Sequence, residues 1–238
     1  MKELLDTLAT WEAGGMTGAD VGRAVVVRTF GSAPRPEGAN LLYATDGRIA
    51  GSVSGGCVEG AAAEEIERAR ATGHARVIRY GISDEEAWDV GLACGGTIDV
   101  LVEPTTPTIV VEAARRSVGT RGRGSAVVTP LPGDSPPADF GPHQPGDGAL
   151  PEEELIVGED GSLSGSLGSS ELDAALVDAA RGALRRGLSR TVELGGRSLF
   201  VEVFPVRPRL VVVGGVEVAR SLVRLAHEHQ GHIGLLHD

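Results

Sequence analysis

The chain has 238 residues, of which 41% are hydrophobic, 23% charged and only 3% aromatic. At about 150 residues per domain, this length allows one large domain or two small ones. The net charge of −11 argues against nucleic-acid and membrane-surface roles, because a protein that follows phosphates needs a basic face. No apolar run approaches about 18 residues and the first residues lack a signal-peptide pattern, so we expect a cytoplasmic protein.

Two residue types narrow the chemistry. Lys2 is the only lysine, so the interior of the fold offers no phosphate-binding lysine of the Walker type and no Schiff-base lysine. The two cysteines, Cys57 and Cys94, do not make a secreted disulfide framework, which favours reduced thiols.

The first hundred residues alternate short apolar runs with glycine-rich turns. An amphipathic helix is predicted over 1–15 by a stripe that includes Leu4, Leu8 and Trp11. The next predicted elements are a strand at 24–27, a loop at 29–35, a hairpin at 39–43 and 48–53, a helix at 58–71, a strand at 76–80, helical turns at 83–88 opened by a capping box, and a strand at 97–102.

The sequence then repeats itself. Residues 46–53 (DGRIAGSV) return 114 positions later as 160–167 (DGSLSGSL), and each copy runs into a small-residue turn and a predicted helix, 58–71 or 172–186. Later in each copy, a Gly-Gly pair precedes an apolar strand and a proline follows it. Such a run of matching features is typical of a duplicated unit. The second copy has Glu171 where the first has Cys57.

We therefore predict an α/β fold made of two related α/β halves, 21–104 and 124–206, within a domain that spans 1–206. Residues 129–151 hold many of the prolines, together with Gly, Asp and Ser, and are predicted to form a long surface loop inserted in the second half.

Residues 207–238 are predicted to form a different unit. A strand at 210–213 enters a glycine turn, a helix follows at 218–229, and a second strand at 232–236 precedes Asp238. This is the β-α-β opening of a dinucleotide-binding fold, with Val216 where the second close-approach glycine belongs. Because a Rossmann sheet needs several more strands, we expect an incomplete Rossmann-like unit that does not bind NAD(P) tightly.

The stretch GSVSGGCVEG at 51–60 stands where a strand gives way to a helix. Ser54 is a candidate N-cap, and Gly55-Gly56 allows a tight turn that exposes backbone amides. Cys57 at the helix start would be exposed to the positive end of the helix dipole, which favours thiolate, and the free N–H groups would suit an anion. The alternative is that Cys57 is a small buried hydrophobe and that the glycines only permit close packing. Both interpretations remain open at this point.

Other candidate groups carry weaker signals. Glu59 could act in the cap region or as a general base, and Arg35 lies in a proline-stiffened loop that could meet a phosphate. A metal site made by Cys57 and Cys94 has no supporting spacing. The histidines near the C-terminus fit a solvated helix end.

Residues 28–35 (RTFGSAPR), 46–60 through GSVSGGCVEG, 80–88 (YGISDEEAW) and 91–96 (GLACGG) resemble the XdhC/CoxI family of accessory proteins for molybdenum hydroxylases such as xanthine dehydrogenase. Members of this family bind molybdenum cofactor (molybdopterin), protect it and help to deliver its sulfurated form to the apo-hydroxylase. The resemblance implies a cofactor-binding chaperone without turnover, whose partner is a hydroxylase of this type, with a cysteine desulfurase as a further candidate partner. A homo-oligomer is also expected.

On this resemblance, the molybdopterin phosphate would lie against backbone N–H groups of the glycine turn, and Cys57 would face the molybdenum or its exchangeable sulfur as the metal ligand. No catalytic residue is assigned. The full set predicted to bind the cofactor is Ser54, Gly55, Gly56, Cys57, Glu59, Cys94 and Arg35.

Two enzymatic alternatives compete with this prediction. An NAD(P)-linked oxidoreductase built on the C-terminal unit is opposed by Val216 and the missing strands. A thiol hydrolase would need a histidine near Cys57, and His74 is the only histidine in the first 142 residues.

Overall fold

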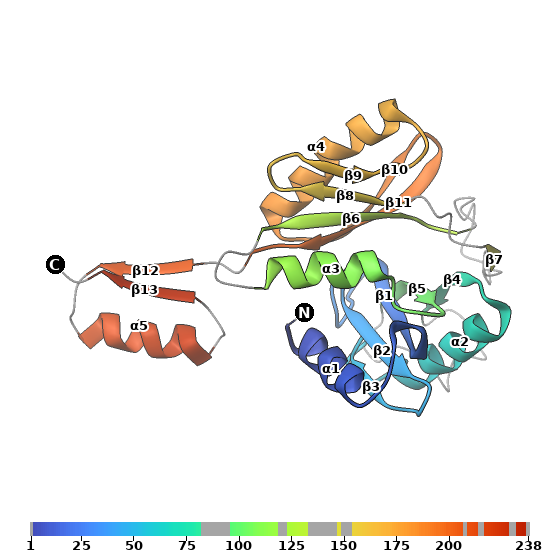
Figure 1. The fold of residues 1–238 in the computed structure, drawn as a ribbon, viewed down its shortest axis with the longest axis horizontal. Coiled ribbons are helices and arrows are strands. Elements are labelled where there is room, and N and C mark those ends of the chain that lie inside the picture. Colours follow the sequence, from blue (N-terminus) through green and yellow to red (C-terminus); the bar gives the residue numbers. More distant parts are fainter. Residues whose placement is uncertain are drawn as a thin grey trace.

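The computed structural model describes residues 2–81, 96–118, 123–132, 147–148, 154–206, 209–213, 217–228 and 232–236. Two β-sheets lie one above the other, with helix α2 on the outer face of the first, α4 on the outer face of the second and α3 between them (Figure 1). No helix in these ranges is long and apolar enough to cross a membrane.

The first half forms an antiparallel sheet in the order β3-β2-β1-β5-β4, extended at its edge by the two-residue strand β7 (Asp147–Gly148). All of its neighbouring strands pair antiparallel. Its elements are α1 (Lys2–Ala13), the short 3-10 helix η1 (Gly18–Asp20), β1 (Val21–Phe30), β2 (Asn40–Ala44), β3 (Ile49–Gly51), α2 (Glu59–Thr72), β4 (Ala75–Tyr80) and β5 (Thr97–Glu103).

The second half forms a five-stranded antiparallel sheet in the order β10-β11-β6-β8-β9. Strand by strand this is the order β4-β5-β1-β2-β3 of the first sheet, so both halves have the same topology. Its elements are α3 (Thr108–Ser117), β6 (Ser125–Pro130), β8 (Leu155–Gly158), β9 (Leu163–Gly165), α4 (Ser170–Arg186), β10 (Arg190–Leu194) and β11 (Arg197–Phe204).

The structural repeat is longer than the sequence predicts, because each half also begins with a helix. Helix α3 precedes β6 as α1 precedes β1, and the sequence analysis assigned no element to 108–117. The run Thr108-Ile109-Val110-Val111 is β-branched and favours a strand locally, but its helical form buries Val110 and Ala113 between the two sheets.

The central strands β1, β5, β6 and β11 are buried on both faces along most of their length, which explains their continuous apolar runs. In β5, Ile98, Val100 and Val102 face α2, while Leu101 packs with Phe200 of the other half. The layer between the sheets therefore forms a third apolar core in addition to the two beneath the outer helices.

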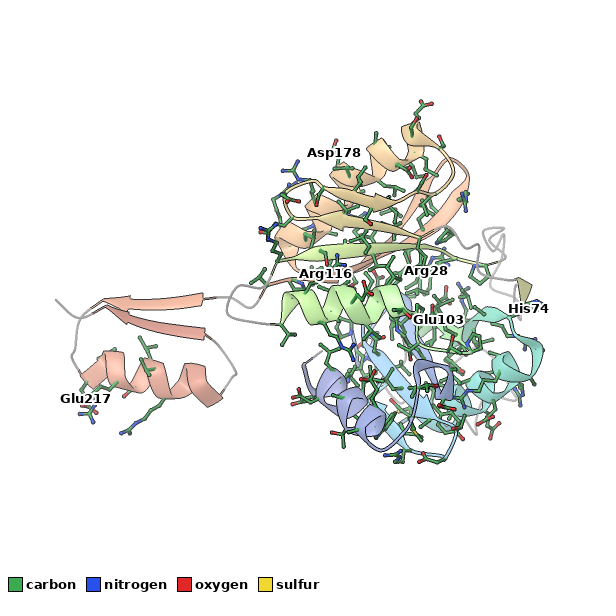
Figure 2. All side chains as sticks on the ribbon, viewed as in Figure 1. Arg28, His74, Glu103, Arg116, Asp178 and Glu217 are labelled. Carbon is green, nitrogen blue, oxygen red and sulfur yellow. The ribbon has the colours of Figure 1, made fainter. Side chains whose placement is uncertain are left out.

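One buried polar cluster crosses this layer. The guanidinium of Arg23 on β1 donates to Glu103 on β5 at 3.1 Å, to Asn40 on β2 at 2.6 Å and to Glu202 on β11 of the second half. All four residues are at least nine-tenths buried, and Asn40 also donates to Glu202 at 3.1 Å. Figure 2 shows Glu103 in this central layer. Because a buried charge without a partner is very unfavourable, the cluster holds the two sheets in one relative position.

Several boundaries differ from the predictions. Thr129 and Pro130 belong to strand β6 and not to the proline-rich loop, and within the predicted loop β7 pairs with β4 of the first half. The predicted turns at 83–88 lie outside the described residues.

In the C-terminal segment, β12 (Arg209–Val213) and β13 (His232–Leu236) pair in parallel and are joined by α5 (Glu217–Glu228). Figure 1 shows this β-α-β unit apart from the two sheets. Glycines 214–215 and Val216 lie outside the described residues.

Replacing Arg23 by alanine is expected to destabilise the protein by about 3–5 kcal/mol, because Glu103 and Glu202 would be left buried without their cation. Urea unfolding measures this change. Arg115→Ala, which removes an exposed ion pair with Glu12, is the control and should cost less than about 1 kcal/mol. Equal effects of the two substitutions would contradict the role of Arg23.

A second prediction concerns pH. Burial raises the pKa of Glu103 from 4.5 to about 7, against the opposing charge of Arg23. Between these two values the folded protein retains a proton that the unfolded chain releases, so stability should fall as pH rises through this window. Glu103→Gln should reduce this fall in unfolding experiments at pH 5 and pH 7.5. An unchanged slope would show that another group is responsible.

Candidate functional site

The described segments that carry the predicted site residues leave the first sheet at one end. Phe30, the last residue of β1, pairs with Thr97, the first of β5, and Tyr80 at the end of β4 pairs with Ile98. At the same end β2 begins and β3 finishes, with Leu41 opposite Gly51. The loops 31–39 and 52–58 therefore leave the sheet at this end, where β4 also finishes and β5 begins.

The glycine turn at 55–56 requires glycine because of its backbone angles. Gly55 has φ of 84° and Gly56 has φ of 117°, a region that side chains rarely allow, whereas space for a Cβ is open at both positions. The turn leads into α2, which begins at Glu59 after the N-cap Val58.

The prediction that Ser54 is the N-cap of this helix is therefore wrong, because the N-cap is Val58, four residues later. Its hydroxyl oxygen instead accepts hydrogen bonds from the N–H groups of Cys57 and Val58, both at 2.9 Å. Ser54 is buried, and these bonds close the turn from the inside.

Cys57 is exposed, so the interpretation of this residue as a small buried hydrophobe is wrong. On either side of the turn, Val53 and Val58 are completely buried in the core beneath α2. These two anchors fix both ends of the turn, and the thiol between them points to solvent. It lies two residues before the first residue of α2.

Glu59 binds the turn that precedes it. Its carboxylate accepts from the Ser52 hydroxyl at 2.6 Å, the Ser54 hydroxyl at 2.7 Å, the Ser54 N–H at 2.9 Å and the Val53 N–H at 3.2 Å. Burial raises the pKa of Glu59, but these hydrogen bonds together outweigh it and lower the pKa to about 2. A carboxylate held in this way organises the loop and is a poor general base.

The same bonds limit the anion site predicted at the turn. The N–H groups of Cys57 and Val58 are bonded to Ser54, and that of Gly55 donates to the Ser52 hydroxyl at 2.7 Å. Within the described turn, Gly56 is left as the residue whose N–H can meet a phosphate without breaking a bond of the loop.

The second half repeats the acid-anchored start of this loop without the thiol, but its helix α4 begins earlier, at Ser170. Asp173 accepts from the Ser166 hydroxyl at 2.7 Å and from the Leu167 N–H at 2.9 Å, and both contacts match those of Glu59 at positions 114 residues earlier. Glu171 occupies the position of Cys57 and is exposed. The acidic anchor is thus part of the repeated scaffold, and Cys57 is what distinguishes the first copy.

Arg35 is exposed in the loop at this end of the sheet. The nearby Ala33 packs against the same core that contains Val53 and Val58. Cys94 lies outside the described residues, so its proximity to Cys57 stays a prediction. Among the described residues, no group of three or more His, Cys, Asp and Glu side chains could hold a metal ion.

Sequence reasoning missed a charged cluster near this edge. Arg79 donates to both carboxylate oxygens of Asp99, at 2.7 and 2.9 Å, and its guanidinium lies 5.0 Å from the ring centre of Phe30. Arg28 lies 3.6 Å from Asp99 and bonds to the Ser198 hydroxyl of the second half at 2.7 Å. An aspartate in the apolar strand 97–102 was the available signal.

Comparison with known proteins agrees with this geometry. A sequence model described as the XdhC and CoxI family matches residues 16–81 and 151–195, which include the glycine turn and its counterpart. The chain belongs to the XdhC and CoxI family. The match covers the corresponding parts of both halves of this XdhC/CoxI protein.

Two curated relatives align with about a third of this XdhC/CoxI protein. The molybdenum cofactor insertion chaperone PaoD of Escherichia coli is 44% identical over 84 residues, which are 35% of this chain and 26% of PaoD. A probable xanthine dehydrogenase subunit of Bacillus subtilis is 36% identical over 88 residues, again 35% of this chain and 26% of the relative. The matches span about a quarter of the length of these relatives.

A solved structure shares the fold. The crystal structure of a xanthine dehydrogenase from Bacillus halodurans superposes with a TM-score of 0.63 and 23% identity, covering 98% of this chain and 61% of that one. At this level of identity the likeness concerns the fold alone.

Glu59→Gln is expected to destabilise the first half by about 1–3 kcal/mol, because an amide cannot accept all the hydrogen bonds that the carboxylate accepts. The wild type should also lose stability as pH falls from 4.5 towards 2, while the variant should lose less. Thermal unfolding at pH 7 and pH 3 checks both effects. The exposed Glu171→Gln is the control, with an expected change within about 0.5 kcal/mol, and equal stability of E59Q and wild type would refute the anchoring role.

Proposed function

We propose that this chain binds molybdenum cofactor as cargo and assists its sulfuration and its insertion into a molybdenum hydroxylase of the xanthine dehydrogenase type. The observation that carries the proposal is the exposed Cys57 on a turn fixed at both ends. In the second half, the equivalent position is Glu171 in the first turn of α4. Membership of the family and the printed name of PaoD, an insertion chaperone, support the same function.

The chemistry of the residues suits such cargo. A cysteine thiolate is a soft ligand for a transition metal, and Cys57 is already turned to solvent. Gly55 and Gly56 have no side chains and have open space around them, so a bulky ligand can approach the thiol closely. The cofactor phosphate would be bound by the Gly56 N–H and by Arg35, while Ser54 and Glu59 keep the turn in place.

The same geometry favours a carrier over a thiol hydrolase. His74 lies between the end of α2 and the start of β4, whereas the thiol lies at the opposite end of that strand. Glu59 is occupied by the loop. Among the described residues at this end of the sheet, Cys57 therefore has no general base beside it. A thiol hydrolase needs such a base, whereas a carrier that binds and releases cargo does not.

Cys57→Ala should lower the amount of molybdopterin that co-purifies with the protein from a molybdopterin-producing host by about tenfold or more, because a metal–thiolate bond is lost. The oxidised pterin is measured by its fluorescence. The fold should be unchanged, since an exposed side chain contributes little to stability.

Glu171→Ala is the matched control, because it alters the equivalent exposed position in the second half. It should retain the wild-type amount of pterin and support activation of the apo-hydroxylase. Unchanged pterin content and unchanged hydroxylase activation by Cys57→Ala would exclude Cys57 as the ligand.

The oxidoreductase alternative makes a separate prediction. The C-terminal unit has the parallel β-α-β arrangement of a nucleotide-binding fold, but Val216 takes the place of a glycine that lets pyrophosphate approach. Calorimetry with NAD and NADP should therefore show no micromolar binding. A micromolar dissociation constant for either nucleotide that is weakened by substitutions in the C-terminal unit would favour the oxidoreductase.

A further inference from the structure

A groove of about 570 Å³ opens on the second half, between the end of α3, the start of β6 and the hairpin of β8 and β9. The residues that line it and matter here are Arg116, Arg123, Ser125, Ile156, Ser162 and Ser164. None of these is among the residues predicted to hold molybdenum cofactor.

At the equivalent place in the first half, α1 packs on the sheet. Trp11 and Leu8 of α1 pack on Val21, Leu42 and Ala44, and Trp11 is only 5% exposed. Arg48 of the β2–β3 turn lies over the indole ring at 5.0 Å. This position in the first half is thus filled by a planar bicyclic ring.

Strand register fixes the correspondence between the two places. Val21 pairs with Ala44 in the first sheet, and Ser125 pairs with Gly158 in the second. Ser125 is therefore the counterpart of Val21, and Gly158 is the counterpart of Ala44. The second half has a polar residue in place of the valine and a smaller residue in place of the alanine.

The two helices differ in the same sense. When the buried Leu5 and Leu8 of α1 are matched with the buried Val110 and Ala113 of α3, Trp11 corresponds to Arg116. The Arg116 side chain is 56% exposed, and Figure 2 shows it on α3 below the second sheet. The second half therefore has neither the indole of Trp11 nor the long side chain of Leu8 at these positions, and the groove occupies the space that they fill in the first half.

Ser125 is the sharpest sign that the groove serves a ligand. Its side chain is 95% buried, and its hydroxyl has no hydrogen-bond partner within the described part of the protein. A buried hydroxyl without a hydrogen-bond partner destabilises a fold. The presence of Ser125 where the first half has Val21 is explained if a ligand forms a hydrogen bond with this hydroxyl.

The charges around the groove are mixed. Arg123 is held beside Arg116 by a 3.1 Å bond from its N–H to the Arg116 carbonyl, so two guanidinium groups share one rim. Asp160 accepts two hydrogen bonds from Ser162, which lower its pKa more than the charge of Arg123 does. Glu159 completes the rim as an exposed carboxylate. The site thus offers cations for an anionic group and oxygen acceptors for a ligand that also carries N–H donors.

We propose that this groove binds the phosphate ester of a planar nitrogen heterocycle. The ring occupies the space that Trp11 fills in the first half and bonds to the Ser125 hydroxyl, while Arg116 and Arg123 bind the phosphate. Nucleotides and phosphorylated pterins share this chemistry. The inference does not rest on the proposed function, because the site is separate from the glycine turn.

Calorimetry on the full chain tests the proposal with four probes: AMP, GMP, the phosphate ester of 6-hydroxymethylpterin, and inorganic phosphate. At least one ester should bind with a micromolar dissociation constant, and inorganic phosphate should bind at least tenfold more weakly. The tighter class of ester identifies the source of the ligand. The proposal is overturned if no ester binds, or if inorganic phosphate binds as tightly as the esters.

Variants then locate the site. Arg123→Ala should weaken binding of the best ester about tenfold by loss of one charge-assisted contact. Arg115→Ala is the matched control, because Arg115 lies on the same helix as Arg116 but pairs with Glu12 outside the groove. Equal binding by the two variants would place the ligand elsewhere.

Ser125→Val introduces the residue that the first half has at this position. It should weaken ester binding and raise the unfolding temperature, because it removes a buried hydroxyl without a partner. A variant that binds the ester as well as the wild type would overturn the role of Ser125, whatever its stability.

Discussion

The relative position of the two sheets depends on one arginine. Register shows that Glu103 and Glu202 are equivalent residues of the two halves, since Glu103 pairs with Arg23 on β1 and Glu202 pairs with Val127 on β6. Without a cation between them, the two buried carboxylates at the centre of this duplicated fold would repel each other. Arg23, which has Val127 as its counterpart, supplies one cation to both, and the resulting asymmetry joins the halves into one unit.

Duplication also separates what the fold needs from what differs between the copies. Both halves anchor the loop before their outer helix with an acid, Glu59 or Asp173, so these carboxylates serve the scaffold. The two copies differ at Cys57, whose counterpart is Glu171, and at Trp11, whose counterpart is Arg116. In a structure with so much shared geometry, a difference at an exposed or groove-lining position is more informative about binding than a shared residue is.

The sequence was a good guide where its signals were local. Apolar periodicity located most strands and both outer helices, and the repeated DG motif led to the prediction of two related α/β halves, each of which contains a sheet with the same strand order. Helix α3 escaped because β-branched residues favour a strand unless tertiary packing decides otherwise. The Arg23 cluster joins residues up to 179 positions apart, and no local pattern reports such a contact. At the site, glycine spacing located the turn, but the real partners of Ser54 and Glu59 depended on backbone angles.

The anchoring of the glycine turn bears directly on how a thiol could exchange cargo. A carrier must bind its cargo and release it again, so the thiol has to be accessible, and it must not lose much entropy on each binding event. Buried valines on both sides and the acid-bonded loop fix the backbone in advance, while the side chain of Cys57 remains in solvent. On the proposed function, preorganisation of the backbone would supply affinity, and exposure of the thiol would keep an open route for a partner to take the cargo. Burial of the same thiol would have favoured retention over transfer.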